Sequence, residues 1–127
     1  MTDNAPAPTE IRLNTDKDEL AVSFGEDTQF KYSAEFLRVQ SPSAEVQGHS
    51  EAQRKTIGGK RFVKINGIEP VGNYAIKISF DDGHDTGLFS WKYLTELGAE
   101  HDARWKFYLF ELEEKGLTRE PKFNLNS

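Results

Sequence analysis

The chain contains no cysteine among its 127 residues. This absence excludes disulfide bridges, cysteine-based zinc sites and thiol nucleophiles, and it fits a reducing compartment. Long apolar runs are missing as well, because no stretch approaches the roughly 20 residues that span a membrane. The N-terminal residues have neither the basic start nor the apolar run of a signal peptide. We therefore expect a cytoplasmic protein with no membrane segment.

An excess of basic residues is also missing. The 16 Lys and Arg are scattered among 21 Asp and Glu, which gives a formal net charge of −5 and a pI of about 5.2. Nucleic-acid binding requires clustered positive charge that displaces counterions from phosphates. The densest basic stretch, residues 54–61, includes Gly58 and Gly59 and is typical of a solvated loop, with a phosphate contact as the alternative. We expect small ligands, metals or protein partners, and no nucleic acid.

Aromatic residues are what the sequence has in quantity: nine Phe, four Tyr and two Trp make up 12% of the chain. Each buries a large area, which offsets an apolar fraction of only 36%. A chain of this length suits one domain with its own core. We expect a single domain over residues 10–116, a disordered tail over residues 1–9 and a flexible tail over residues 117–127.

Alternation of apolar and polar residues predicts strands, because successive side chains of a strand point to opposite faces. Six runs with this pattern are expected strands: residues 10–14, 20–24, 28–32, 62–68, 73–80 and 86–89. The first three fit an antiparallel meander. In the run 73–80 we place Tyr74 on the same face as Ile76 and Phe80. A long exposed loop is expected over residues 47–61.

The apolar period changes to that of a helix in the C-terminal third. Ser33 can cap a short helical turn over residues 34–37, and Ser90 can cap a longer helix that Gly98 is expected to end. A last helix is predicted from Trp105 to Gly116, with Glu111 and Lys115 as an ion pair. The expected fold is therefore α+β: a small antiparallel β-rich domain, in meander or sandwich-like sheets, with two C-terminal helices packed against it.

Recognisable catalytic constellations are absent from the sequence. Gly58-Gly59-Lys60 lacks the spacing of a phosphate-binding loop, there is no Gly-x-Ser-x-Gly elbow, and no spacing matches the three His to a nucleophile. The richest polar cluster is residues 81–85, a predicted turn. Its candidate ligands for weakly bound zinc or iron are His84, Asp82 and Asp85, because a turn can direct such groups at one point. The alternative is an acidic hairpin turn without a ligand.

A second polar stretch, residues 38–49, precedes the expected loop. Glu45 and His49 are four residues apart and would join the candidate ligands if the segment were helical, although Gly48 argues against a helix. Polar residues beside a flexible loop suit partner recognition. The residues assigned to such a partner surface are Arg38, Ser41 and Ser43. The alternative is structural, with Arg38 paired to Glu45 or to an Asp of the 81–85 turn.

Two stretches are more distinctive than composition. One is residues 37–49, LRVQSPSAEVQGH, and the other runs from residue 69 to 94 and contains EPVGNYAI, FDDGHDTG and SWKYL. Together they closely resemble the gamma-butyrobetaine hydroxylase-like N-terminal domain family, a domain of unknown function also called DUF971. The resemblance spans roughly residues 8–115, and it identifies the chain as similar to the short, free-standing bacterial form.

The resemblance implies a compact antiparallel fold with helices packed against it. Such domains also precede the catalytic domain of iron- and 2-oxoglutarate-dependent hydroxylases, where they hold zinc and help dimerisation, and accompany the ATPase of some iron–sulfur carriers. In the hydroxylases three Cys and one His bind the zinc. The matching positions here are Ser41, Ser43, Val46 and His84, so a closed zinc site is not expected.

The oxygenase domain has no counterpart in this sequence, so hydroxylase activity does not carry over. The leading interpretation is a non-catalytic interaction module linked to iron or iron–sulfur metabolism by family analogy alone. Its expected partner is an iron–sulfur carrier ATPase or an oxygenase, and its expected state is a monomer or weak homodimer. One alternative is a metal-binding protein that uses His84 with nearby carboxylates. Another is an enzyme acting on a small molecule between sheet and helices.

Overall fold

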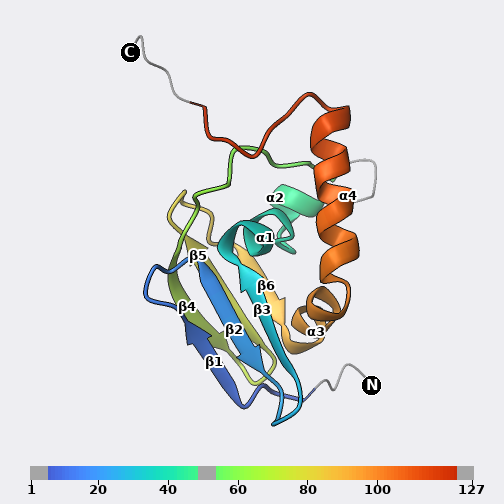
Figure 1. The fold of residues 1–127 in the computed structure, drawn as a ribbon. Coiled ribbons are helices and arrows are strands. Elements are labelled where there is room, and N and C mark those ends of the chain that lie inside the picture. Colours follow the sequence, from blue (N-terminus) through green and yellow to red (C-terminus); the bar gives the residue numbers. More distant parts are fainter. Residues whose placement is uncertain (1–5, 49–53, 123–127) are drawn as a thin grey trace.

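The computed structural model describes residues 6–48 and 54–122, which form two three-stranded antiparallel sheets and four helices (Figure 1). The first sheet has the order β1-β2-β3 and the second β4-β5-β6. The strands are β1 (Glu10–Leu13), β2 (Glu19–Ser23), β3 (Gln29–Ser33), β4 (Ile65–Val71), β5 (Ala75–Phe80) and β6 (Gly87–Ser90). The helices are α1 (Ala34–Val39), α2 (Ala44–Gln47), α3 (Trp91–Ala99) and α4 (His101–Glu114). The predicted α+β class is confirmed.

The second sheet differs in detail from the prediction. β4 begins at Ile65, three residues later than expected, and it continues through Pro70 to Val71. Proline is tolerated there because β4 lies at the edge of its sheet and lacks a neighbour on one side. Tyr74 is 57% exposed, so it does not share the buried face of Ile76 and Phe80 as expected.

The core joins both sheets to α1 and α3. Its fully buried members come from every layer, including Leu20, Tyr32, Phe36, Ile78, Phe89 and Leu94. The Tyr32 hydroxyl donates to the Leu94 carbonyl oxygen at 2.6 Å, which satisfies a buried polar group. Burial raises the pKa of Tyr32 well above its ordinary value. The aromatic residues counted in the sequence therefore fill the centre of the molecule, as their number predicts.

Helix α1 begins at the predicted cap, where Ser33 Oγ accepts the Phe36 N–H at 2.9 Å. It extends to Val39, two residues further than expected. Helix α2 was not expected, and it ends at Gly48, whose φ of 66° lies in the left-handed region that glycine favours. Gly48 thus ends a short helix instead of preventing one.

Helix α3 begins at the predicted cap, since Ser90 Oγ accepts the Tyr93 N–H at 3.0 Å. Gly98 does not end it, because the helix continues to Ala99. The reason for glycine is packing: a Cβ at this position would lie 2.3 Å from Cγ of Phe30. The Phe30 ring of β3 therefore packs directly against the backbone of α3.

Helix α4 stands along one side of the molecule, beside α1 and α2 (Figure 1). Tyr108 and Leu112 are buried, whereas Leu109 is 39% exposed and does not belong to the inward face as predicted. The expected Glu111–Lys115 pair does not form. Glu111 instead pairs with Arg54, and Lys115 donates to the Thr56 hydroxyl at 2.8 Å.

The segment after α4 crosses to the chain that precedes β4 (Figure 1). The Gly59 N–H donates to the Thr118 carbonyl at 2.8 Å and the Arg61 N–H to the Arg119 carbonyl at 3.0 Å. Arg119 also binds both carboxylate oxygens of the buried Glu35, at 2.7 and 2.8 Å. These contacts attach Thr118 and Arg119 to the main body of the domain, although both lie in the region that was expected to be a flexible tail. None of the helices described here is long and apolar enough to cross a membrane.

Candidate functional site

His84 lies in the turn between β5 and β6, and its side chain is only 4% exposed. The turn is shaped by Gly83, whose φ of 92° requires a residue that tolerates the left-handed region. The Phe80 N–H donates to the His84 carbonyl at 2.9 Å and closes the turn. This geometry directs the imidazole inward, towards the segment that links α1 to α2.

Both ring nitrogens of His84 are engaged by that segment. Nε2 lies 2.9 Å from Ser41 Oγ and 3.4 Å from Ser43 Oγ, and Nδ1 lies 3.0 Å from Glu45 Oε1. A carboxylate only accepts hydrogen bonds, so Nδ1 carries the proton and Nε2 accepts from the Ser41 hydroxyl. Burial, reinforced by the positive charge of Arg38, lowers the pKa of His84 below its ordinary value. The neutral imidazole is therefore the form that the site holds.

Asp82 supports the turn from its other side. Its Oδ2 accepts from Arg38 Nε at 2.8 Å and from Lys60 Nζ at 2.6 Å, and its Oδ1 accepts the His84 N–H at 3.1 Å. Burial alone would raise the pKa of this carboxyl. The bonds from Lys60, His84 N–H and Arg38 outweigh burial and hold the pKa at about 2. Asp82 is thus a structural anion, and we call Ser41, Ser43, Glu45, Asp82 and His84 the His84 network.

The network has no spare volume beside Ser41. A Cβ at Gly87 would lie 2.3 Å from Ser41 Oγ, so only glycine allows β6 to approach this hydroxyl. Ser41 is fully buried and Ser43 is 8% exposed. The predicted partner surface is therefore turned inward: Arg38 bonds Asp82, and Ser41 and Ser43 contact His84. A partner would reach these side chains only if the His84 network opened.

The residues of the His84 network do not fit a closed zinc site. Ser41 and Ser43 offer only neutral hydroxyls, which are poor zinc ligands, and Val46 is buried and apolar. Within residues 6–48 and 54–122, no three His, Asp or Glu side chains group so as to hold a metal ion. Asp85 is exposed, and His49 lies outside the described residues.

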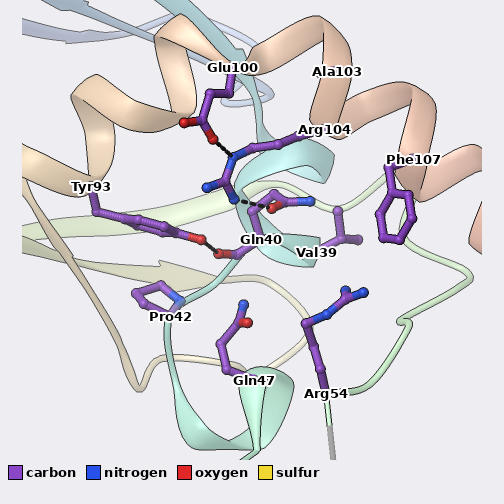
Figure 2. Close-up of a pocket in the computed structure, with 10 residues that line it drawn as sticks. All are labelled: Val39, Gln40, Pro42, Gln47, Arg54, Tyr93, Glu100, Ala103, Arg104 and Phe107. Carbon is purple, nitrogen blue, oxygen red and sulfur yellow. Dashed lines mark hydrogen bonds and ion pairs between the residues drawn. The ribbon is translucent and has the colours of Figure 1, made fainter. Parts of the chain in front are cut away.

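A groove opens on the other side of the same segment, between it and α4 (Figure 2). Its volume is about 630 Å³, within the range of ligand sites. We call it the α4 groove. Its apolar lining comes from Val39, Pro42, Tyr93, Ala103 and Phe107, and its polar lining from Gln40, Gln47, Arg54, Glu100 and Arg104.

The polar groups of the α4 groove are held in place by one another. Arg104 donates to Glu100 Oε1 at 2.8 Å and to Gln40 Oε1 at 2.9 Å, and its guanidinium stacks on the Tyr93 ring (Figure 2). Gln47 Nε2 donates to the Ser41 carbonyl at 2.9 Å. Within the described chain, no hydrogen bond uses Gln40 Nε2 or Gln47 Oε1. One donor and one acceptor therefore remain available in the groove.

The groove and the His84 network share one segment, residues 40–47. Ser41 and Ser43 turn towards His84, whereas Gln40, Pro42 and Gln47 line the groove. The Tyr93 hydroxyl fixes the segment from α3 by donating to the Gln40 carbonyl at 2.5 Å. The segment is not a strand: Gln40 ends α1 with φ −101° and ψ 10°, Ser43 is extended, and Gln47 belongs to α2.

Comparison with known proteins identifies the fold. A family model described as gamma-butyrobetaine hydroxylase-like, N-terminal matches residues 11–95, which include the His84 network and Tyr93. The chain belongs to the gamma-butyrobetaine hydroxylase-like N-terminal family. α4 and the segment after it lie beyond the matched residues.

Solved structures agree with this family assignment. Two NMR solution structures are 46% and 44% identical to the chain, with a TM-score of 0.79 each. They cover 95% and 98% of this chain, and the match spans 95% and 92% of theirs. A crystal structure of a DUF971 protein of unknown function from Acidithiobacillus ferrooxidans is 34% identical, with a TM-score of 0.61, over 73% of this chain and 93% of that one. No curated protein matches the chain.

The prediction that Ser41 and Ser43 lie near His84 came from the family resemblance alone, and the structure places both hydroxyls in contact with the imidazole. The α4 groove was not among the predicted sites. Its walls come from α1, α2, α3, α4 and the residues around them, and no spacing in the sequence links such distant positions. The sequence does contain Phe107 outside the predicted apolar face of the last helix, but Phe110 shares that property and does not line the groove.

Proposed function

We propose that this chain is a non-catalytic protein-binding module accessory to iron or iron–sulfur metabolism, and that it docks its partner in the α4 groove. The proposed occupant is an extended segment of an iron–sulfur carrier ATPase or of an oxygenase. The iron link rests on the company that the family keeps, which is an analogy.

The main support for the proposal is that the groove combines apolar walls with one hydrogen-bond donor and one hydrogen-bond acceptor that other groups of the described chain do not use. An extended peptide offers one N–H and one C=O per residue, and burying them unpaired is costly. Gln40 Nε2 and Gln47 Oε1 match those two groups. Tyr93 and Phe107 supply aromatic surface for one apolar side chain of the partner. Peptide recognition commonly combines such backbone bonds with side-chain pockets.

The charges of the groove favour a neutral segment over an anion. Arg104 is paired with Glu100, and Arg54 is paired with Glu111. Each guanidinium is therefore balanced by a neighbouring carboxylate. In this proposal the His84 network is a support: it fixes residues 40–47, so that Gln40 and Gln47 keep their positions before the partner arrives.

The test uses two exposed phenylalanines of α4 as a matched pair. Phe107 is 53% exposed and lines the groove, whereas Phe110 is 56% exposed and does not. The full chain, Phe107→Ser and Phe110→Ser would be used to recover partners from native cytosol. We expect an iron–sulfur carrier or an oxygenase to bind the wild type and Phe110→Ser, and to lose at least about tenfold in recovery with Phe107→Ser. The proposal would be contradicted if neither an iron–sulfur carrier nor an oxygenase were recovered, or if all three proteins recovered them equally.

Metal binding is the alternative, favoured by the exposed Glu45 carboxylate beside His84 Nδ1. A metal at this nitrogen must displace its proton and the bond to Glu45. Stoichiometric zinc or iron in the purified protein, lost in His84→Gln, would support this alternative.

A further inference from the structure

Arg119 anchors the segment after α4 to the body of the domain. Its Nη2 and Nε donate to the two carboxylate oxygens of Glu35, at 2.7 and 2.8 Å. The guanidinium also lies over the Trp105 ring, with Cζ 5.2 Å from the ring centroid. Two parallel bonds to a carboxylate and a flat contact with an aromatic ring are specific to arginine, because a lysine ammonium is a point charge. We call residues 117–122 the strap, and Glu35 with Trp105 the arginine site.

The carboxylate of Glu35 is built to receive a guanidinium. Its side chain is only 5% exposed, and a buried carboxylate is unfavourable unless a cation and hydrogen bonds compensate it. Within the described chain, Arg119 supplies every hydrogen bond and ion pair that this carboxylate makes. Glu35 comes from α1, whereas Arg119 lies 84 positions later and outside residues 11–95, which the family model matches. The site therefore requires a guanidinium, but not one from this particular segment.

The backbone contacts of the strap carry no sequence information. The N–H groups of Gly59 and Arg61 donate to the carbonyls of Thr118 and Arg119, and any extended segment offers carbonyls in the same way (Figure 1). A Cβ at Gly58 would lie 2.8 Å from the Thr118 carbonyl oxygen, so glycine is what allows the strap backbone to approach. These bonds select an extended backbone, and the arginine site selects one side chain.

The strap leaves space on two sides. One hollow of about 570 Å³ is lined by Arg119, Trp105 and Phe62, which is 63% exposed, among others. A second hollow of about 490 Å³ lies between residues 56–59 and the strap. Both volumes fall within the range of ligand sites. A segment with larger side chains beside its arginine therefore buries more surface here than the strap does.

We propose that the arginine site binds an extended, arginine-bearing segment of another protein, which takes the place of the strap. The incoming segment keeps the paired bonds to Glu35 and the two backbone bonds, and it adds side chains in the two hollows. In the free chain Arg119 occupies the site, so the strap is an internal competitor that lowers the apparent affinity for the partner. Glu35, Trp105 and Arg119 do not line the α4 groove, so this site is separate from the proposed function.

A peptide titration of the full chain tests the site. The probe is the capped hexapeptide LTREPK, which copies residues 117–122, and its control carries citrulline in place of arginine. We expect the probe to bind Arg119→Gln at least about tenfold more tightly than the wild type, because the strap competes at an effective concentration of about millimolar. The citrulline peptide should bind Arg119→Gln at least about tenfold more weakly than the probe.

The two indole N–H signals in NMR spectra give the position of the bound probe. The signal of Trp105 should shift when the probe binds Arg119→Gln. The signal of Trp91 should not, because this side chain is 8% exposed as a residue and donates to the Asn73 carbonyl at 2.8 Å. Binding that shifts Trp91 and leaves Trp105 unchanged would place the probe elsewhere and overturn the proposal.

A second variant guards against loss of the fold. Arg119→Lys keeps a positive charge beside Glu35 but cannot form the paired bonds, so its affinity for the probe should lie between those of the wild type and Arg119→Gln. Circular dichroism verifies that both variants fold. The proposal is overturned if neither variant binds the probe more tightly than the wild type, or if the citrulline peptide binds equally well. A wild-type dimer that Arg119→Gln abolishes would assign the site to the strap of a second copy and would also overturn it.

Discussion

At the scale of single residues, His84 is held by two kinds of group. A carboxylate fixes the proton on Nδ1, and a hydroxyl donates to Nε2. The hydroxyls of Ser41 and Ser43 and the carboxylate of Glu45 together satisfy both nitrogens of a neutral imidazole. The sequence singled out His84 as the centre of a polar cluster, but the contact with Glu45 depends on α2, a helix of four residues that periodicity cannot detect.

The lowered pKa of His84 predicts a pH dependence of stability. In the unfolded chain the pKa returns to 6.5, so the unfolded state binds more protons as the pH falls through that value. The contribution of the neutral His84 to the free energy of unfolding should therefore be fully present above pH 6.5, and the free energy of unfolding should decrease as the pH falls below that value. Urea unfolding between about pH 7.5 and pH 5.5 measures the slope.

The control for this slope is His84→Gln, whose amide can occupy the site but does not titrate. We expect the variant to be less stable at neutral pH and to have a smaller slope over this range. Asp82 does not interfere, because its contribution is lost only between pH 3.8 and about 2. An equal slope in both proteins would show that another group is responsible.

At the scale of elements, local patterns predicted most strands and both serine caps, since these depend on residues near one another. Gly98 shows where such reasoning ends. Glycine near the end of an apolar helical period indicates a stop, but here it lies inside α3 because Phe30, 68 positions earlier in the chain, occupies the space. Only the packed structure distinguishes a glycine that ends a helix from one that admits a neighbour.

Gly98→Ala should therefore destabilise the protein, although alanine has the higher helix propensity by about 1 kcal/mol. The new Cβ would lie 2.3 Å from the Phe30 ring. Overpacking of this kind costs about 1–3 kcal/mol, which exceeds the gain in propensity. Urea unfolding measures the change, with Gly67→Ala as control, because a Cβ at Gly67 meets nothing within 4 Å.

A smaller residue at position 30 should relieve the clash. The double variant Gly98→Ala with Phe30→Leu is expected to be more stable than the sum of the two single effects predicts. If Gly98→Ala is as stable as the wild type, or if the two effects simply add, the packing explanation for this glycine is wrong.

At the scale of the whole molecule, the family fold supplies a frame, and α4 adds one wall of a groove to it. The other wall of the α4 groove comes from residues 39–47. This groove was not predicted from the sequence. The groove gathers side chains 68 positions apart, from Val39 to Phe107, so no local pattern in the sequence predicts it.

The most direct test of the binding account is photo-crosslinking from the groove in living cells. A benzophenone amino acid would replace Phe107, which lines the groove, and in a control protein Tyr74, which is 57% exposed and does not line it. The account predicts adducts with an iron–sulfur carrier or an oxygenase from position 107 and none of these from position 74. The absence of such adducts at position 107, or the same adducts from both positions, would contradict it.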